Sequence, residues 1–513
     1  MILGRSASIL IALLAFLPCT GSRAAGQDDL AARIAEQLSC TETILDRNAH
    51  IEPEVVRDIP QVPSWCSLLP LEKHRIRVGD CELYCETEGA GTPIVLLHGG
   101  PGATHHYFHP AFSRAADFAR VIYYDQRGCG VSDYHAGAGY SLEQALDDLD
   151  RLREALGFDQ WIVLGHSYGG LVAQSYVLKY PNRVKGLILV GASLGFDADT
   201  GDWRQSEYLS KEERARIREI QRMEDLSLAQ RVYNAFLNGD WKRQHFCKPT
   251  ADQFARIALY EWKQDPEFRS ALNSQTSWLD LWGGFEGCPI PTLIVEGKWD
   301  LTWGAKKAEV LRSNHPNARL VIVDRAGHSP FASNPDEFFP LLREFVTSLP
   351  DVATARVAAW KERSTAWREQ AMPESLLAMA ALPWGHRSSV KIAEAYRPEW
   401  LTHLRRTAPL VRIGFALYDV KRYEDALAVY RRMAEAGASE AKRQAVAYIW
   451  QGHMFDLLGR RVEAIAAYQK AVDLKVTSGI EHSQYNLVYK PSEYAAMRLT
   501  VPFERIENKD QDN

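Results

Sequence analysis

Short apolar runs recur through the middle of the chain, and longer segments with helical spacing separate them. The runs are 93–97, 121–124, 161–164, 186–190, 291–295 and 320–323. Runs of this kind are typical of strands buried on both faces of a parallel sheet, and the helical segments between them form its crossovers. Two alternating runs, 75–78 and 82–86, precede them and indicate a hairpin at the sheet edge. The pattern predicts an α/β fold with a mostly parallel sheet and helices on both faces.

One crossover helix has clear boundaries in the sequence. Ser141 and Gln144 have the spacing of a capping box at a helix N-terminus, and Gly157 is a typical C-terminal stop. The last strand precedes a helix that we expect to begin near Asn334 and Pro335.

The interval from about 197 to 287 interrupts the alternation of strand and helix. It is rich in charged helical segments and contains Trp203, Trp241, Trp262, Trp278 and Trp282. We interpret it as a helical cap inserted into the sheet domain. The tryptophans either fill the core of this cap or line a substrate pocket, and both roles are compatible with the sequence.

From residue 350 to residue 513 the chain is largely amphipathic helix, and two segments within about 409–476 repeat. Gly414, Leu417, Ala426, Leu427 and Tyr430 recur as Gly452, Phe455, Ala464, Ile465 and Tyr468. The pattern resembles tetratricopeptide repeats, with a spacing slightly above the usual ~34 residues. Because stacked helix pairs need neighbours, we expect this region to bind a protein partner or to mediate self-association.

The N-terminal residues have the pattern of a targeting segment. Arg5 precedes an apolar run over 9–17, and small residues follow up to Ala25. Residues 1–25 are therefore predicted to be a signal peptide, and the run is too short for a stable membrane span. Residues 26–70 follow as an N-terminal helical extension. We expect a secreted or periplasmic protein.

Length, charge and cysteines narrow the picture further. A chain of 513 residues exceeds one ordinary core, which favours a large α/β domain over 71–349 beside the C-terminal helical domain. The net charge of −5 is dispersed, so no nucleic acid partner is expected.

Removal of the signal peptide leaves seven cysteines, an odd number. Cys81 and Cys85 are too far apart along a strand to pair, whereas Cys40 with Cys66 and Cys247 with Cys288 are candidate pairs.

A G-x-S-x-G arrangement lies at the end of the third apolar run. Residues 161–170 read WIVLGHSYGG, so Ser167 follows a strand and precedes a helix. Glycines two residues to either side permit a sharp turn that exposes a serine hydroxyl. Ser167 is the candidate nucleophile.

The two partners of a serine nucleophile follow in the order that such sheets require. Asp300 comes after the strand 291–295, and His328 comes after the strand 320–323. The histidine would take the serine proton, and the carboxylate would hold the imidazole in the correct tautomer. Asp324 is the rival acid, but its closeness to His328 in sequence favours a turn residue. His315, beside Pro316, is expected at the surface.

Backbone N–H groups beside the nucleophile would stabilise an oxyanion. Tyr168 follows the serine directly, and Gly99 and Gly100 follow the first parallel strand, where a side chain would block close approach. The alternative for the two glycines is a turn with no role beyond its geometry.

The remaining histidines near these motifs have less specific signals. His98 and His166 flank the site and are interpreted as structural or pocket-lining residues. His105, His106 and His109 form a cluster without cysteines or carboxylates at metal-binding spacing. We therefore expect no metal and no cofactor, and interpret the cluster as a histidine-rich loop near the mouth of the site.

Several motifs together identify a family resemblance over roughly 75–349. They are HGGPG at 98–102, DQRGCG at 125–130 followed by Ser132, GHSYGG at 165–170, Gly297 with Asp300, and Gly327 with His328. This combination resembles the proline iminopeptidase branch of the α/β-hydrolase superfamily. The resemblance implies a catalytic triad of Ser167, Asp300 and His328 with an oxyanion region at Gly99, Gly100 and Tyr168.

The resemblance also implies recognition of a substrate amino group by acidic residues of the cap. Glu261, with its neighbour Trp262, is the best match, and Glu207 is a second. The alternative is that Glu261 is an ordinary exposed helix residue.

The expected function is therefore that of an exported serine hydrolase which releases N-terminal residues from small peptides through an acyl-enzyme. An esterase, lactonase or amidase of the same fold is the first alternative. The second is an exported adaptor whose repeats bind a partner while the hydrolase fold serves as a scaffold.

Overall fold

The computed structural model describes most of the chain after residue 54. The described residues are 55–134, 139–192, 194–195, 210–235, 237, 255–256, 259–260, 263–300, 302–371, 373–380, 382, 385–437, 441–477, 480–482 and 487–505. The predicted signal peptide, residues 1–25, lies outside these ranges. So does most of the predicted N-terminal helical extension.

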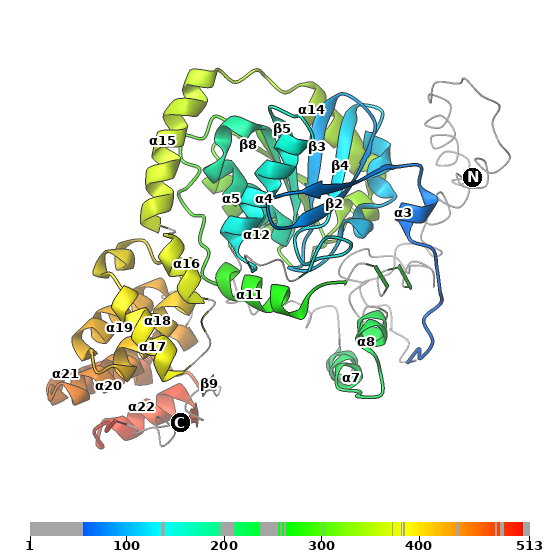
Figure 1. The fold of residues 1–513 in the computed structure, drawn as a ribbon. Coiled ribbons are helices and arrows are strands. Elements are labelled where there is room, and N and C mark those ends of the chain that lie inside the picture. Colours follow the sequence, from blue (N-terminus) through cyan, green and yellow to red (C-terminus); the bar gives the residue numbers. More distant parts are fainter. Residues whose placement is uncertain are drawn as a thin grey trace, which may run out of the picture. The chain divides into compact units, whose positions relative to one another are not determined.

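An eight-stranded sheet forms the centre of the larger part of the chain (Figure 1). Its strands are β1 (Glu72–Arg77), β2 (Glu82–Glu88), β3 (Thr92–Leu97), β4 (Ala119–Tyr124), β5 (Trp161–His166), β6 (Val184–Val190), β7 (Thr292–Gly297) and β8 (Ala318–Val323). The order is β1-β2-β4-β3-β5-β6-β7-β8. Strand β2 pairs antiparallel with β1 and β4, whereas every pairing from β4 to β8 is parallel. The predicted mostly parallel sheet with an edge hairpin is confirmed.

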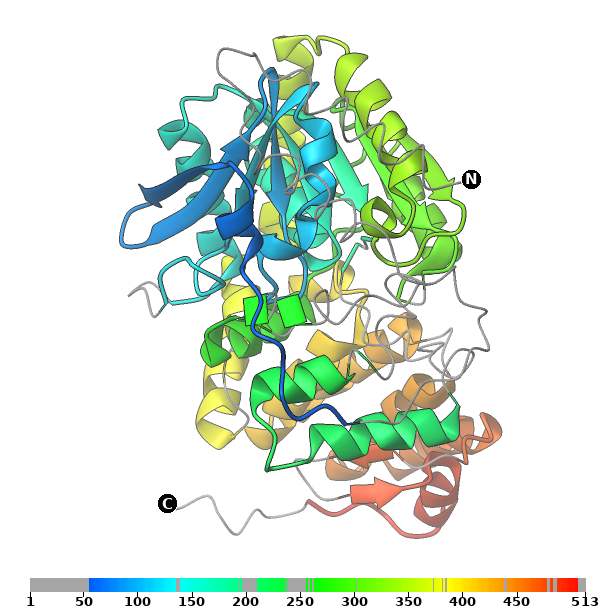
Figure 2. The same ribbon diagram turned by 90° about the vertical axis from the view of Figure 1, so that its right-hand side faces the viewer.

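Helices lie on both faces of the sheet (Figures 1 and 2), and the central strands β3, β5 and β6 are almost wholly buried, which explains their continuous apolar runs. On one face, alternate residues such as Ile94, Ile162 and Ile188 join a core with phenylalanines that include Phe112 and Phe338. The intervening strand residues are also buried and point to the opposite face, because side chains alternate along a strand. Two covered faces leave only the strand ends free for chemistry.

Helices and 3-10 turns follow the parallel strands, as crossovers between strands and, after β8, as the end of the sheet domain. They are α4 (Leu142–Ala155), α5 (Tyr168–Lys179), α12 (Gly304–Asn314), α13 (Pro330–Ser333) and α14 (Pro335–Thr347), with 3-10 turns η1 (His105–Phe108), η2 (Ala111–Ala115) and η3 (Pro181–Arg183). The predicted start of α4 is confirmed, because the Ser141 hydroxyl accepts the Gln144 N–H at 3.1 Å. The reciprocal half of a capping box differs, since the Gln144 amide donates to Asp148 instead. Gly157 ends the helix segment with a φ of 77°.

The interval between β6 and β7 contains three α-helices within its described parts, joined to β7 by turns over 277–291. It contains α7 (Lys211–Gln221), α8 (Leu228–Ala235) and α11 (Pro266–Thr276). A complete capping box starts α7, in which Ser210 and Glu213 each accept a backbone N–H from the other. Trp203, Trp241 and Trp262 lie outside the described residues.

The described segment before the sheet contains α3 (Trp65–Leu68) and packs on parts of the cap interval. The Arg256 guanidinium lies over the Trp65 ring, 4.2 Å from its centroid, and the Tyr260 hydroxyl donates to the Val62 carbonyl at 2.6 Å. Cys66 in this helix and Cys288 both carry free thiols, which contradicts the two candidate pairings; their expected partners, Cys40 and Cys247, lie outside the described residues. Cys81 and Cys85 are also free, as expected.

No helix within the described ranges is both long enough and apolar enough to cross a membrane.

The chain divides into two compact units, Met1–Asn273 with Leu281–Thr365, and Ser274–Asp280 with Ala366–Asn513. Helix α15 (Thr354–Ala371) runs across the division. The second unit contains α16 (Glu374–Ala380), α17 (His386–Ala395), η6 (Pro398–Thr402), α18 (Thr407–Asp419), α19 (Tyr423–Ala436), α20 (Ala441–Leu457), α21 (Arg461–Asp473), β9 (Ile480–His482), β10 (Leu487–Tyr489) and α22 (Pro491–Arg498).

The sequence repeat in this second unit has a physical basis in helix packing. A Cβ atom on Gly414 would lie 2.6 Å from the Tyr430 ring, and one on Gly452 would lie 2.3 Å from the Tyr468 ring. In each case a glycine on the first helix admits a tyrosine from the next helix against its backbone. The pairs α18 with α19 and α20 with α21 therefore repeat one packing contact.

Candidate active site

Ser167 lies on a strained turn between β5 and α5. Its φ of 55° and ψ of −121° are rarely adopted by residues other than glycine, at a cost of roughly 1–3 kcal/mol. Residues 161–170 are buried except for Ser167, which is partly exposed. The turn thus presents one hydroxyl outward from an otherwise buried segment.

The neighbouring glycines are required by close backbone approach. A Cβ on Gly165 would lie 2.3 Å from the Gly169 carbonyl oxygen, and one on Gly169 would lie 2.1 Å from the Leu97 carbonyl oxygen of β3. Backbone atoms cannot move aside as a flexible side chain can. Glycine at these positions lets α5 begin directly against the strands, as the G-x-S-x-G spacing predicts.

Asp300 and His328 meet beyond the ends of β7 and β8. The Nδ1 atom of His328 lies 2.7 Å from Oδ2 of Asp300, and the Asp300 side chain is fully buried. The other carboxylate oxygen, Oδ1, accepts the N–H groups of Thr302 at 2.6 Å and Trp303 at 3.2 Å. Because a carboxylate can only accept, His328 carries its proton on Nδ1 and keeps Nε2 as an acceptor.

The environment of Asp300 keeps it ionised. Burial alone would raise the pKa of its carboxyl, but the attraction to the His328 ring in its protonated form and the hydrogen bond from that ring hold the pKa below the ordinary value. The neighbouring Glu296 behaves in the opposite way, because burial and the Asp300 charge raise its pKa well above the ordinary value. Two adjacent carboxyls are thus divided into one charged and one neutral group.

The loop that carries His328 is tied to the Ser167 turn through His166. The Tyr107 hydroxyl lies 2.9 Å from Nδ1 of His166, and Nε2 of His166 lies 3.0 Å from the His328 carbonyl oxygen. Since that carbonyl can only accept, His166 carries its proton on Nε2 and accepts from Tyr107. His166 is therefore a structural link between the two loops, consistent with its predicted role.

The Gly99–Gly100 turn lies against the nucleophile. A Cβ on Gly99 would be 3.0 Å from the Ser167 Cβ. The Gly99 N–H, however, donates to the Tyr107 hydroxyl at 2.6 Å. Gly100 is exposed and has a φ of 117°, which only glycine adopts readily. No motif in the sequence indicated Tyr107, because its role depends entirely on the folded loop.

Two other histidines are buried as neutral groups. His98 accepts the Gln126 N–H at 3.1 Å, and burial lowers its pKa to about 4. His315 is only 2% exposed, and burial lowers its pKa to about 3. The expectation of a surface His315 is wrong, because its ring packs 4.0 Å from that of Phe285 and its Nε2 reaches the Gln174 amide oxygen.

The DQRGCG segment makes buried hydrogen bonds and ion pairs next to the site. Asp125 accepts both the backbone N–H and Nδ1 of His105 at 2.8 Å. Arg127 donates two hydrogen bonds to the Asp148 carboxylate, at 2.8 and 2.9 Å, and one to Asp80. The motif is thus structural, with one charge facing the histidine cluster and another facing α4.

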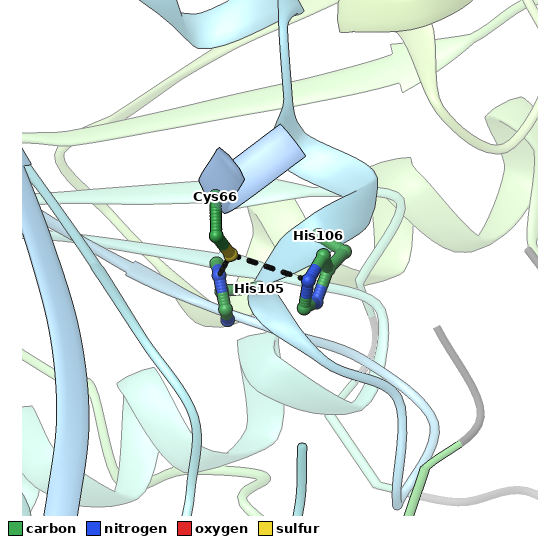
Figure 3. Close-up of side chains that lie close together, drawn as sticks. All are labelled: Cys66, His105 and His106. Carbon is green, nitrogen blue, oxygen red and sulfur yellow. Dashed lines mark hydrogen bonds between the residues drawn. The ribbon is translucent and has the colours of Figure 1, made fainter. Parts of the chain in front are cut away.

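The histidine cluster is buried and is not isolated from other metal-binding residue types. The Sγ atom of Cys66 lies 3.3 Å from Nε2 of both His105 and His106 (Figure 3). Glu86 reaches Nε2 of His109 at 2.9 Å. The expectation of no metal assumed that such ligands were lacking. The fold supplies them from segments distant in sequence.

The predicted substrate-binding residues of the cap are not among the described residues. Glu261, Trp262 and Glu207 all lie outside them. Their assignment stays a prediction.

Comparison with known proteins assigns the family. An α/β-hydrolase fold family matches residues 92–335. The proline iminopeptidase of Lactobacillus delbrueckii subsp. bulgaricus is 31% identical over 312 residues, which cover 55% of this chain and 99% of the relative. That of Saccharolobus solfataricus is 28% identical over 274 residues, which cover 52% of this chain and 87% of the relative.

A crystal structure of a proline iminopeptidase from Mycobacterium smegmatis is 22% identical, covering 56% of this chain and 99% of that one with a TM-score of 0.43. This structural likeness is too low to carry weight beside the sequence matches. Because this chain spans nearly the whole of a relative at 31% identity, it belongs to the α/β-hydrolase family, in its proline iminopeptidase branch.

Proposed function

We propose that the protein is a serine hydrolase that releases N-terminal residues, proline first, from small peptides through an acyl-enzyme. The observation that carries the proposal is the buried Asp300–His328 hydrogen bond of 2.7 Å, on a loop tied through His166 to the turn that holds the partly exposed Ser167. The ionised Asp300, the His328 tautomer with its proton on Nδ1 and the partial exposure of Ser167 are those that nucleophilic catalysis requires. The names of the sequence relatives support the choice of substrate.

In the proposed reaction, Ser167 Oγ attacks the scissile carbonyl while Nε2 of His328 takes the hydroxyl proton. Asp300 stabilises the imidazolium that forms, and His328 then returns the proton to the leaving amine. Water repeats the sequence on the acyl-enzyme, which frees the N-terminal residue and restores Ser167. Each proton passes through the one imidazole nitrogen that the Asp300 contact leaves free.

The proposed oxyanion donors are the N–H groups of Tyr168 and Gly100. Gly99 was an equal candidate from the sequence, but its N–H is engaged by Tyr107. We therefore assign Gly99 the role of holding the turn, with Gly100 as the donor. Loss of one such donor costs about 100- to 1000-fold in turnover.

The test uses the full-length protein, a fluorophosphonate probe and a panel of aminoacyl arylamides, proline first, beside neutral esters and lactones. We expect Ser167→Ala to lose both labelling and turnover. Ser313→Ala is the matched control, because its hydroxyl is exposed on α12 and bonds only to the preceding helical turn among its described contacts. Turnover that persists in Ser167→Ala would overturn the mechanism, and turnover of esters alone would replace the aminopeptidase by an esterase.

Recognition of the substrate amino group is assigned to Glu261, with Trp262 and Glu207 as further candidates. Glu261→Gln should then raise KM for amine-bearing substrates far more than for neutral esters. Glu267→Gln, an exposed position at the start of α11, is the control. Equal effects of Glu261→Gln on both substrate classes would remove this role.

Export rests on the leader pattern of residues 1–25, and we propose a secreted or periplasmic enzyme. Cell fractionation with mass spectrometry of the mature N-terminus tests it. Cytosolic protein that retains its first residues would contradict it.

The two repeated helix pairs of the second unit support a role in contact with protein, either a partner or another copy. Light scattering on the full chain over a range of concentrations tests self-association. If the mass stays that of a monomer at every concentration, a separate protein partner remains as the proposal. Cross-linking in the native extract tests for such a partner. The absence of any cross-linked species would refute a role in protein contact.

A further inference from the structure

Cys66, His105 and His106 converge on one point in the larger unit (Figure 3). Sγ of Cys66 lies 3.3 Å from each Nε2 atom, and all three ligand atoms lie within 4.8 Å of one another. Two ligands on a tetrahedral Zn²⁺, with Zn–S of about 2.3 Å and Zn–N of about 2.0–2.1 Å, are separated by roughly 3.6 Å. The spacing of the three atoms is close to that of three ligands on one ion.

The far nitrogens of both rings are held in the way that metal-binding histidines require. Nδ1 of His105 lies 2.8 Å from the Asp125 carboxylate, which can only accept, so that nitrogen carries a proton. Nδ1 of His106 lies 3.2 Å from the Thr104 hydroxyl, whose own hydrogen goes to the Tyr260 carbonyl at 2.8 Å. Both hydrogen bonds require the ring proton on Nδ1, which leaves Nε2 of each ring as the metal-binding nitrogen.

Two Nε2 lone pairs then face a single sulfur. A thiol has one hydrogen and satisfies one of them, so the metal-free arrangement needs a second proton, on Nε2 of His105. A divalent cation replaces the thiol proton and that second proton together, without changing the net charge of the buried cluster. The cluster therefore has the composition and charge to exchange two protons for one ion.

The carboxylate of Glu86, which lies beside this cluster, already accepts hydrogen bonds from other side chains. Glu86 accepts from His109 at 2.9 Å and from the Tyr84 hydroxyl at 2.6 Å, so direct hydrogen bonds already use its oxygens. His105 belongs both to the group with Cys66 and His106 and to a second group with Glu86 and His109, and its Nε2 lies 3.6 Å from Oε2 of Glu86. We therefore place the ion at the sulfur and treat Glu86 as a nearby negative charge that favours a cation.

The three ligands come from two segments, α3 and η1, and residues of the cap interval pack against both. Cys66 comes from α3, anchored by Arg256 over the Trp65 ring. The His106 ring stacks on Tyr260 with centroids 5.2 Å apart. Cys66 is only partly buried, which leaves a route for the ion to enter.

We propose that Cys66, His105 and His106 form a Zn²⁺ site that fastens the N-terminal extension to the η1 turn. Thiolate with two imidazoles is a ligand set that zinc favours over magnesium or calcium. The three ligands take no direct part in the proposed Ser167 reaction, so metal binding can be tested independently of that reaction.

The experiment uses tag-free full-length protein in two measurements, zinc content by elemental analysis and titration of the metal-free protein with Co²⁺. We expect one Zn²⁺ per chain, and Co²⁺ to produce a thiolate charge-transfer band with tetrahedral visible absorption. Cys66→Ala should abolish the band and weaken Zn²⁺ binding by more than about 100-fold, and His106→Gln should weaken it by at least about 10-fold. Cys288→Ala, a buried free thiol outside the cluster, should leave both unchanged.

Circular dichroism separates loss of the site from loss of the fold, because Zn²⁺ should raise the melting temperature of the native protein and not that of a folded Cys66→Ala. Absence of stoichiometric binding would overturn the proposal. So would binding that survives Cys66→Ala but is lost in His109→Gln, since that ion would lie at Glu86. A disulfide at Cys66, detected by alkylation and mass spectrometry, would also overturn it.

Discussion

Asp300→Asn is the substitution whose outcome the site geometry fixes most closely. Oδ1 of Asp300 is held by two backbone donors, the N–H groups of Thr302 and Trp303. In the variant, the amide oxygen must take this position, because an amide nitrogen there would face two donors. The amide nitrogen therefore points at Nδ1 of His328, where the native carboxylate oxygen accepted at 2.7 Å.

A donor in that position reverses the tautomer of His328. The imidazole must then accept on Nδ1 and carry its proton on Nε2, the nitrogen that the mechanism needs as the base. The imidazolium also loses the adjacent negative charge. An amide in place of the acid of a serine triad lowers turnover by about 10,000-fold, which corresponds to ~5.4 kcal/mol of transition-state stabilisation. The loss should appear in kcat, with KM nearly unchanged, because Asp300 acts on His328 in the transition state and does not bind the substrate itself.

The assay is steady-state hydrolysis of prolyl arylamide by matched preparations of the native protein and two variants. Asp324→Asn is the control, because Asp324 was the rival acid in the sequence but is exposed and paired with Lys298 at 2.7 Å. We expect Asp324→Asn to remain within about 2-fold of native, as for a surface ion pair. A loss below about 10-fold in Asp300→Asn, or an equal loss in Asp324→Asn, would refute the assignment of the acid.

Three further outcomes follow from single contacts. Tyr107→Phe leaves the Gly99 N–H without its acceptor, and we expect kcat to fall by up to about 10-fold, equivalent to a hydrogen bond of ~1.4 kcal/mol. Arg127→Met leaves the buried Asp148 carboxylate without its bidentate partner, and the free energy of unfolding in urea should fall by about 3–5 kcal/mol. His315 stays neutral in the folded state down to a pKa of about 3, whereas the same side chain in the unfolded chain binds a proton below pH ~6.5. His315 should therefore contribute about 2 kcal/mol to the loss of native stability on going from pH 7 to pH 5, in addition to the loss from buried His98, and His315→Gln should remove this share.

Each of these has an outcome that contradicts it. Unchanged kcat in Tyr107→Phe would show that the Gly99 contact does not position the turn. Glu344→Gln, which removes an exposed pair with Arg319, is the control for Arg127→Met and should cost about 0–1 kcal/mol. Equal slopes of unfolding free energy against pH in native protein and His315→Gln would exclude His315 as the titrating group.

The parts of the fold that the sequence predicts correctly are those set by local pattern. The strands around Ser167 and Asp300 were identifiable because burial on both faces makes every residue apolar. The start of α4 at Ser141 and of α14 at Pro335 followed from the chemistry of helix ends. The candidate residues at 167, 300 and 328 were found in the same way, since parallel strands end at one edge of the sheet.

The parts that escaped prediction depend on contacts between distant segments. Cys66 and His106 are 40 positions apart, and neither carries a local sign of the other. His315 follows a helix and precedes a proline, as a surface residue would, yet Phe285 covers its ring. Tyr107 reads as one aromatic residue among histidines. Periodicity reports whether a residue is buried, but it does not report which residues share its environment.

Residues 105–107 connect the proposed metal site to the proposed active site. His105 and His106 face the Cys66 thiol, and the next side chain, Tyr107, holds the Gly99 N–H and His166. A shift of this 3-10 turn on loss of the ion must therefore displace the Tyr107 hydroxyl. A double-mutant cycle of Cys66→Ala and Tyr107→Phe, measured on kcat with Zn²⁺ present, should give a coupling energy of at least ~0.5 kcal/mol. Additive effects would mean that the cluster fastens the N-terminal segment without influence on the Ser167 turn.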